Sequence, residues 1–342
     1  MTMVARAVHM FETTPMPDAL RRTAVSMLVA NTSRQLRATP PDATRRFAED
    51  MRTRPIAEHT DAANAQHYEV SAAFFHQCLG PRLKYSCCRY EEAGDSLAHA
   101  EDRALAEACA NAGLLDGQSI LELGCGWGSL TLWMAEHYPS ARVVAVSNSR
   151  SQRAHIEATA ARRGFSNVTV ITADANVFHT DQRFDRIVSI EMFEHMSNWR
   201  ALLERCRSWL QPHGQMLMHV FAHRRAPYRF DPGNQNDWVA QHFFAGGVMP
   251  SRDLIRNFQD IFSVEREWWW NGVNYQRTAN DWLANFDANI DVIRPILLET
   301  YGRESRAWET RWRLFFLATA GLFGHGNGEE WGVVHHLLKP VR

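Results

Sequence analysis

The sequence predicts an α/β fold built on a doubly wound parallel sheet. From Gln118 onward, short β-branched runs alternate with amphipathic stretches, which is typical of parallel strands joined by crossover helices. A glycine-rich turn follows the first of these runs. Hydrophobic residues make up 45% and charged residues 22% of the 342 residues, as in ordinary globular domains. Apolar burial can therefore offset the entropy lost on folding, which excludes disordered and fibrous classes.

The regular part of the chain contains five expected strands with helices between them. The strands are predicted at 119–123, 142–146, 168–172, 184–190 and 215–220, and the helices near 128–137, 150–162 and 198–210. The last helix shows how the local signals agree, because Ser197 and Asn198 can cap its start and Pro212 and Gly214 follow its end.

The two ends of the chain depart from this alternation. Residues 1–65 are rich in Ala, Arg and Thr and show helical apolar spacing around Met27 and Leu36, so we expect a helical extension. Residues 223–250 form an insertion with Pro and Gly that is too long for an ordinary connection, which indicates a functional loop or lid. Helices are expected at 251–260, 279–300 and 305–323, and the run at 333–338 could pair antiparallel with 263–270.

Charge and cysteine usage narrow the class of protein. Lys and Arg number 37 against 38 Asp and Glu, and this net charge of -1 argues against a nucleic-acid partner. No stretch reaches the roughly 18 uncharged apolar residues that span a bilayer, and residues 1–10 lack the features of a secretory signal. The six cysteines have no metal-ligand spacing. We therefore expect a cytoplasmic enzyme with free thiols and no metal.

The glycine-rich turn, ELGCGWG at 122–128, is the strongest signal for a ligand. Glycines at 124, 126 and 128 let a ligand approach the backbone without a Cβ in the way. The third glycine comes one position too early for the G-x-G-x-x-G dinucleotide fingerprint, and the chain has no phosphate-binding G-x-x-x-x-G-K-[ST] loop. The turn resembles motif I of class I S-adenosylmethionine-dependent methyltransferases, with a purely structural turn as the alternative.

Three further motifs narrow the resemblance. They are AVSNS at 145–149 followed by Gln152, YSC at 85–87, and EMFEH at 191–195. Together they resemble the cyclopropane fatty-acyl-phospholipid synthase superfamily, most closely its coclaurine N-methyltransferase branch, from about His67 to the C-terminus. The resemblance implies a seven-stranded, Rossmann-like class I methyltransferase sheet in a domain spanning 66–342. The insertions at 223–260 and 276–325 would form helical lids over the substrate.

The resemblance also implies S-adenosylmethionine as the cofactor and S-adenosylhomocysteine as its product. Each implied contact belongs to one part of the cofactor. The contacts are Tyr85 and Ser86 closing over it, Gly124 and Gly126 at the amino-acid part, Ser147, Asn148 and Gln152 at the ribose, and Asp174 and Ala175 at the adenine.

The acidic and imidazole groups after the fourth strand fit methyl transfer to an amine. An alkylammonium has no lone pair, so a base within hydrogen-bond reach must take up its proton. We expect Glu191 to anchor the ammonium, and Glu194 with His195 to act as the base. If the segment is helical, the two carboxylates lie on one side of it. The alternative is that these groups only cap the next helix.

The lipid-modifying branch gives a competing interpretation, in which the methyl group goes to an unsaturated acyl chain and a bound bicarbonate removes a proton. Its bicarbonate cage maps onto Cys87, Glu194, His219 and Tyr275, although each could also be an ordinary buried residue. The motif GNGEEW at 326–331 favours the amine branch, in which Phe323 and Trp331 could contact a cationic amine. The expected partner is then a small-molecule amine, with a homodimer left open and membrane contact at most peripheral.

Overall fold

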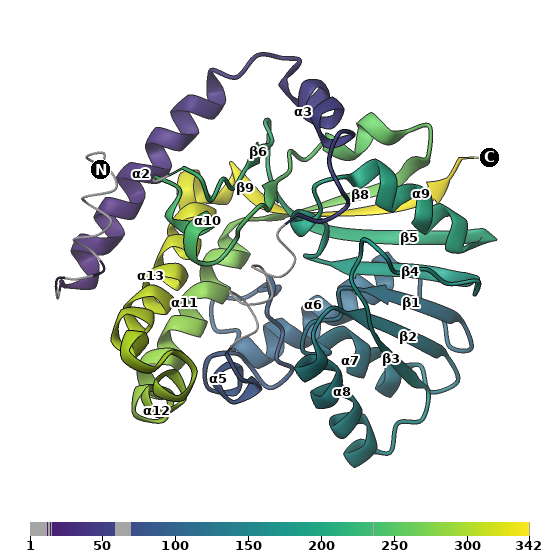
Figure 1. Ribbon diagram of the computed structural model, residues 1–342, viewed down its shortest axis with the longest axis horizontal. Coiled ribbons are helices and arrows are strands. Elements are labelled where there is room, and N and C mark those ends of the chain that lie inside the picture. The colour runs from purple at the N-terminus through teal and green to yellow at the C-terminus, as the bar shows by residue number, and fades with distance from the viewer. Residues whose placement is uncertain (1–11, 13, 15, 59–69, 235, 342) are drawn as a thin grey trace.

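A seven-stranded mixed sheet forms the centre of the computed structural model, which describes residues 12, 14, 16–58, 70–234 and 236–341. The strand order is β3-β2-β1-β4-β5-β9-β8 (Figure 1). The first five strands are parallel, and β9 runs antiparallel to both β5 and β8. The strands are β1 Ser119–Leu123, β2 Arg142–Ser147, β3 Val168–Thr172, β4 Phe184–Ile190, β5 Leu210–His223, β8 Phe262–Asn271 and β9 Trp331–Pro340. The doubly wound sheet and its antiparallel edge are therefore confirmed.

One predicted strand is much longer in the structure. The run expected at 215–220 belongs to β5, which begins at Leu210 because that residue pairs with Phe184 across an irregularity in the register with β4. The preceding helix ends before Pro212 and Gly214, as expected. The strand, however, also begins before these two residues rather than after them. The expected boundary between residues 65 and 66 lies outside the described residues.

Helices cover both faces of the sheet. On one face lie α6 (Leu97–Asn111), α7 (Ser129–His137) and α8 (Arg150–Arg163). On the other face lie α9 (Trp199–Trp209) and α3 (Ala43–Met51). Alternation along the strands explains both layers, since Ile120 and Val143 pack with α6 and α7 while Leu121 and Val144 pack with α9 and α3. The core therefore has an apolar layer on each side of the strands.

A second group of helices stands beside the carboxyl ends of the strands (Figure 1). It contains α5 (Ala72–Cys78), α11 (Val273–Ala288), α12 (Ile290–Tyr301) and α13 (Ser305–Gly324), with short 3-10 turns η3 (Gly302–Glu304) and η4 (His325–Gly328). The prediction of one helix over 279–300 is wrong, because the chain breaks at Asn289, whose side chain donates a hydrogen bond to the Gln77 carbonyl. The helix expected at 251–260 is also wrong, since only the 3-10 turn η2 (Leu254–Phe258) forms there.

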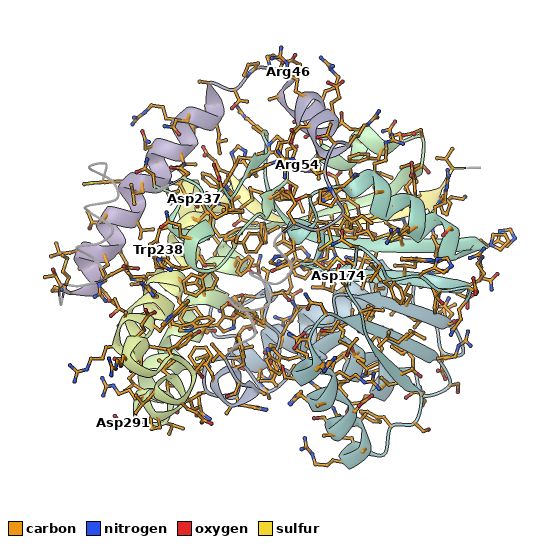
Figure 2. The ribbon with its side chains drawn as sticks, in the orientation of Figure 1. Arg46, Arg54, Asp174, Asp237, Trp238 and Asp291 are labelled. Atoms are coloured by element: carbon orange, nitrogen blue, oxygen red, sulfur yellow. The ribbon has the colours of Figure 1, made fainter. Side chains whose placement is uncertain are left out.

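The N-terminal helix α2 (Asp18–Arg37) packs along α13. A side chain at Gly321 would overlap Val25, so the glycine permits this close approach. The insertion after β5 contains β6 (Tyr228–Arg229), α10 (Trp238–His242) and β7 (Val248–Met249). Trp238 in this insertion, which Figure 2 shows beside α2, donates a hydrogen bond to Glu12. Within the described part of the chain, no helix is long and apolar enough to cross a membrane.

We expect Gly272→Ala to destabilise the fold by about 1–3 kcal/mol, since overpacking forces neighbouring atoms to shift. Gly272 joins β8 to α11, and a Cβ there would overlap the carbonyl oxygens of Trp331 and Phe323. Urea unfolding measures the loss. The matched control is Gly94→Ala, where a Cβ meets nothing within 4 Å and stability should change by less than about 0.5 kcal/mol. Equal stability of both variants would contradict this packing.

Candidate functional site

A cavity of about 820 Å³ lies where the carboxyl ends of the strands meet the second group of helices. Its walls come from the sheet, the insertion after β5, α13 and α2. Every residue expected to contact the cofactor lines it. These residues are Tyr85, Ser86, Gly124, Gly126, Ser147, Asn148, Gln152, Asp174 and Ala175. Ligands bind at the same edge of other open α/β sheets.

The glycine turn gives the cavity a floor of bare backbone. The amides of Gly124 and Cys125 both donate to the Val146 carbonyl, which holds the turn against β2. Gly126 has a φ of 51°, a conformation that favours glycine, and a Cβ there would meet nothing within 4 Å. The space beside Gly126 is therefore open to a ligand.

Two buried donors beside this turn have no hydrogen-bond partner among the described residues. They are Gln152 Nε2 and Trp127 Nε1, and both residues line the cavity. The amide of Gln152 is held in place because its Oε1 accepts a hydrogen bond from Ser147 Oγ at 2.6 Å. Buried donors are normally satisfied, so the pair fits a ligand with hydrogen-bond acceptors, such as a ribose and a carboxylate. Trp127 was missed in the sequence, although its place inside the glycine motif could have indicated it.

The N-terminal segment covers the part of the cavity that Asp174 and Ala175 line. Asn176 accepts a hydrogen bond from the Ala57 amide at 3.0 Å and donates one to the Ala57 carbonyl at 3.1 Å. Ala57 and Glu58 line the cavity together with Asp174, which Figure 2 labels near the ends of the strands. This segment is therefore fixed directly beside the residues expected to meet the adenine.

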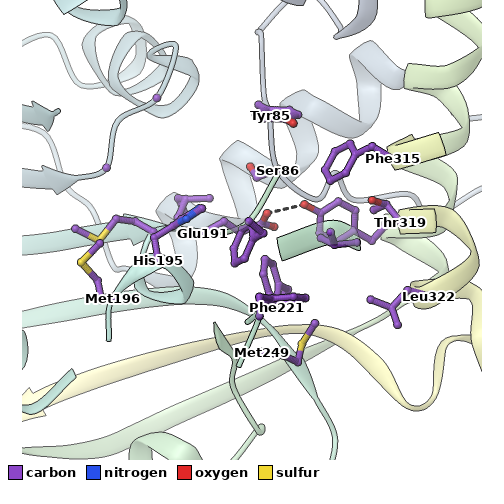
Figure 3. A pocket seen from close by; sticks show the side chains of 18 of the residues that line it. Tyr85, Ser86, Glu191, His195, Met196, Phe221, Met249, Phe315, Thr319 and Leu322 are labelled. Atoms are coloured by element: carbon purple, nitrogen blue, oxygen red, sulfur yellow. Dashed lines mark hydrogen bonds between the residues drawn. The ribbon is translucent and has the colours of Figure 1, made fainter. Parts of the chain in front are cut away.

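Glu191 is the polar centre of the cavity. It follows β4 with a φ of 47°, and its amide donates to the His219 carbonyl. Its Oε1 accepts hydrogen bonds from the Cys87 amide at 2.9 Å and from His219 Nε2 at 3.2 Å. Its Oε2 accepts one from the Tyr275 hydroxyl at 2.7 Å (Figure 3). Three donors from separate parts of the chain thus converge on one carboxylate.

Burial dominates the protonation states around Glu191. It raises the pKa of the Glu191 carboxyl, and the positive charge of Lys84 acts in the opposite direction. Burial holds the pKa of His219 well below its usual range, so the ring is neutral and its Nε2 carries the donated hydrogen. Burial raises the pKa of Tyr275 and of the Cys87 thiol, so both stay protonated.

The two other candidate catalytic residues of the EMFEH motif, Glu194 and His195, point to different places. The segment forms one 3-10 turn, η1 (Phe193–His195), so Glu191 and Glu194 do not share a helical face as expected. His195 lines the cavity, and burial lowers its pKa to about 4 while the charge of Glu191 raises it. Glu194 lies behind the cavity wall, where its Oε1 accepts a hydrogen bond from the Phe221 amide at 2.6 Å. Burial raises its pKa well above the usual range.

An apolar chamber adjoins Glu191. Tyr275 and Phe323 stack with their rings 4.3 Å apart, and Phe221 lies next to them. Figure 3 shows Phe315 and Thr319 of α13 beside the same chamber. The remaining apolar lining includes Met249, Leu322, Val25, Leu28 and Val29.

Four of the expected site residues do not line the cavity: Glu194, as described above, and Cys87, His219 and Trp331. Cys87 contributes its backbone amide, and His219 only reaches the cavity through Glu191. Trp331, expected in the substrate pocket, is instead fully buried at the start of β9, against the His223 ring. Trp331 is buried because β9 pairs with β5 at this point. Sequence motifs do not indicate this pairing.

Comparison with known proteins confirms the resemblance found in the sequence. The chain matches the family described as mycolic acid cyclopropane synthetase over residues 57–329. It is 36% identical over 294 residues to (S)-coclaurine N-methyltransferase of Thalictrum flavum subsp. glaucum, covering 84% of this chain and 81% of that protein. It is 28% identical over 271 residues to cyclopropane-fatty-acyl-phospholipid synthase of Escherichia coli (strain K12), covering 79% of this chain and 66% of that protein.

The similarity to a solved structure extends over almost the whole chain. The fold superposes on the crystal structure of a coclaurine N-methyltransferase bound to N-methylheliamine and SAH with a TM-score of 0.92 and 32% sequence identity. The superposition covers 99% of this chain and 100% of that chain, so the shared architecture extends to the N-terminal helices.

We expect Gly126→Val to abolish binding of S-adenosylhomocysteine, because the side chain would fill the open space beside the turn. Isothermal titration calorimetry measures this. Gly164→Val is the matched control, since Gly164 also has a positive φ, of 73°, and open space around it, but lies outside the cavity at the end of α8. The control carries the same backbone strain, so retained affinity in Gly126→Val would show that the cofactor lies elsewhere.

Proposed function

Because the chain belongs to the mycolic acid cyclopropane synthetase family and is an S-adenosylmethionine-dependent methyltransferase, we propose that it transfers a methyl group to the nitrogen of a small-molecule amine. Relatives of both branches match the sequence, so the choice between amine and lipid depends on the residues of the cavity. Similarity to the N-methyltransferases extends over more of the chain and supports the amine.

The observation that carries the proposal is the position of the Glu191 carboxylate. Of the four groups expected to form a bicarbonate cage, Cys87, His219 and Tyr275 all donate hydrogen bonds to Glu191 itself. A carboxylate has the planar shape and the acceptor oxygens of bicarbonate, so a bicarbonate ion would compete with Glu191 for the same donors. This arrangement favours a site that binds a cationic amine.

The residues at the glycine turn fit the cofactor. Gln152 and Trp127 would donate to it, and Gly126 would leave room for it. When bound, S-adenosylmethionine supplies a methyl carbon attached to a sulfonium sulfur, which leaves as S-adenosylhomocysteine with the electron pair of the broken bond. The chain must then align the amine and keep water away from the reacting atoms.

Glu191 would anchor the substrate as an ion pair with its ammonium group. Among the described residues, Tyr275 is the one donor to its Oε2, so this oxygen can accept another hydrogen bond from an N–H of the amine. His195 lines the same cavity as a neutral imidazole and would take up the amine proton, which frees the nitrogen lone pair. The charge of Glu191 would then stabilise the imidazolium. Glu194 would support this arrangement from behind through its hydrogen bond to Phe221.

The aromatic chamber would hold the organic part of the amine. The ring faces of Tyr275 and Phe323 can also interact with the positive charge, at about 0.5–2 kcal/mol for each contact. Helix α2 and the insertion after β5 complete the wall, so a bound amine would be largely shielded from water.

The test of the proposal is an incubation with methyl-labelled S-adenosylmethionine and two substrate panels, aralkyl amines and unsaturated phospholipids. We expect label in one or more amines, with the methyl group on nitrogen. Label in phospholipid alone would refute the proposal and favour the lipid-modifying function.

We expect Glu191→Gln to lower kcat/KM for an accepted amine by about a hundredfold or more at pH 7, because the ammonium loses its counter-charge. Affinity for S-adenosylhomocysteine should stay within a few fold, since the variant keeps the glycine turn. Steady-state kinetics and calorimetry measure the two effects. An unchanged kcat/KM would remove Glu191 from the anchoring role.

We also expect small carboxylates to restore part of the activity of Glu191→Ala. The variant empties the corner in which Cys87, His219 and Tyr275 converge, so formate or bicarbonate can accept their hydrogen bonds. Amine methylation is measured with and without each ion at constant ionic strength, using chloride as the control. The wild-type rate should not depend on bicarbonate. A wild-type rate that falls when bicarbonate is removed would contradict this assignment of the corner.

A further inference from the structure

Lys84 is a buried lysine that lines the same cavity as Glu191. The residue is 2% exposed. Its Nζ donates hydrogen bonds to Ser86 Oγ and to the Cys87 carbonyl, each at 2.6 Å. Both acceptors are uncharged, and no direct ion pair of Lys84 with a carboxylate is found within the described ranges. The ammonium therefore lies inside the protein without an adjacent counter-ion.

A buried ammonium needs negative charge nearby to offset the loss of hydration. Two buried carboxyl groups hold the short segment that carries Lys84. Glu101 accepts hydrogen bonds from the Arg82 amide at 2.8 Å and the Lys84 amide at 3.1 Å. Glu191 accepts one from the Cys87 amide at 2.9 Å. Lys84 and Glu191 thus bind opposite ends of the same residue, since the carbonyl of Cys87 accepts from one and its amide donates to the other.

We propose that Lys84 is a positioning residue for methyl transfer, whose ammonium keeps the Glu191 carboxylate ionised and, through Cys87, holds it in place. The inference rests on the proposed function insofar as it gives Glu191 the role of amine anchor. The electrostatic interaction between Lys84 and Glu191 does not require a substrate, so it can be measured without an amine.

Lys84 is the main source of positive charge near Glu191, because the other groups that face Glu191 are uncharged. Burial keeps His195 and His219 neutral, because it lowers the pKa of both rings. The pKa of the third histidine in this region, His335, is also lowered by burial. The remaining neighbours are acidic groups whose pKa is raised by burial and which therefore hold their protons: Cys87, Glu194 and Tyr275.

Three further ionisable groups, Arg89, Glu107 and Glu101, lie around these neighbours of Glu191. Arg89, near Cys87, is ion-paired with Glu107 at 3.1 Å. Glu101 also interacts with the positive charge of Lys84, as Glu191 does. Burial raises the pKa of Glu101 to about 7. A substitution at Lys84 and one at Glu101 should therefore shift the titration of Glu191 in opposite directions.

The direction follows from electrostatics. Removing the cation favours the uncharged acid, so the pKa of Glu191 rises and a larger fraction is protonated at pH 7. A protonated Glu191 cannot pair with an ammonium. For Lys84→Met we therefore expect kcat/KM for an amine to fall at pH 7, to recover at higher pH, and to show an acid limb about one pH unit or more above that of the wild type.

The deciding experiment is an infrared titration of the folded protein without amine or cofactor. The carbonyl band of protonated Glu191 is identified by its loss in Glu191→Gln. In Lys84→Met this band should appear at a pH about one unit or more above that of the wild type, and in Lys84→Arg close to the wild-type pH. An unshifted band in Lys84→Met would overturn the proposal, even if activity falls, because Lys84 would then be a structural residue only.

Glu101→Gln keeps the inference testable if Lys84→Met does not fold. The glutamine retains an oxygen that can accept from the Arg82 and Lys84 amides, but it removes the competing negative charge. The Glu191 band should then appear at lower pH than in the wild type, and an unchanged titration would contradict the shared charge. If no amine is methylated while the bands shift as expected, the proposed function fails and the charge pairing stands.

Discussion

The organisation of the cavity depends on keeping one carboxylate, that of Glu191, away from water. A buried carboxylate is costly unless donors and positive charge surround it. Here the donors come from the segment after α5, from β5 and from α11, which lie far apart in the sequence. The sheet and the second group of helices therefore meet at this side chain, and its hydrogen bonds to His219 and Tyr275 are among the contacts that join them.

The same corner of the cavity could hold a planar anion other than the Glu191 carboxylate. The donors Cys87, His219 and Tyr275 form a receptor for a planar anion, and they place no demand on whether that anion is a side chain or an ion from solution. A glutamate at position 191 supplies the anion from the chain itself. Under the proposed function, this fixed negative charge would attract a cation into the aromatic chamber, whereas an exchangeable ion could act on an uncharged substrate.

Sequence patterns predicted the sheet well because buried parallel strands are short and rich in β-branched and apolar residues, as in the run at 143–146 of β2. The glycine turn was also predictable, since few residues other than glycine adopt a positive φ. The break at Asn289 was missed because a tertiary hydrogen bond to Gln77 fixes it. The different directions of Glu191 and Glu194 were missed because they depend on a positive φ at a non-glycine residue, which no local pattern indicates.

One side of the cavity wall comes from residues 21–35 and from Ala57 and Glu58. Helix α2 lies against α13, with Val25 opposite Gly321, and Ala57 is fixed to Asn176 by two hydrogen bonds. Neither segment carries the glycine turn or the acidic corner. Substitutions in this terminal region can therefore change the shape of the chamber while they leave the glycine turn and the Glu191 carboxylate in place.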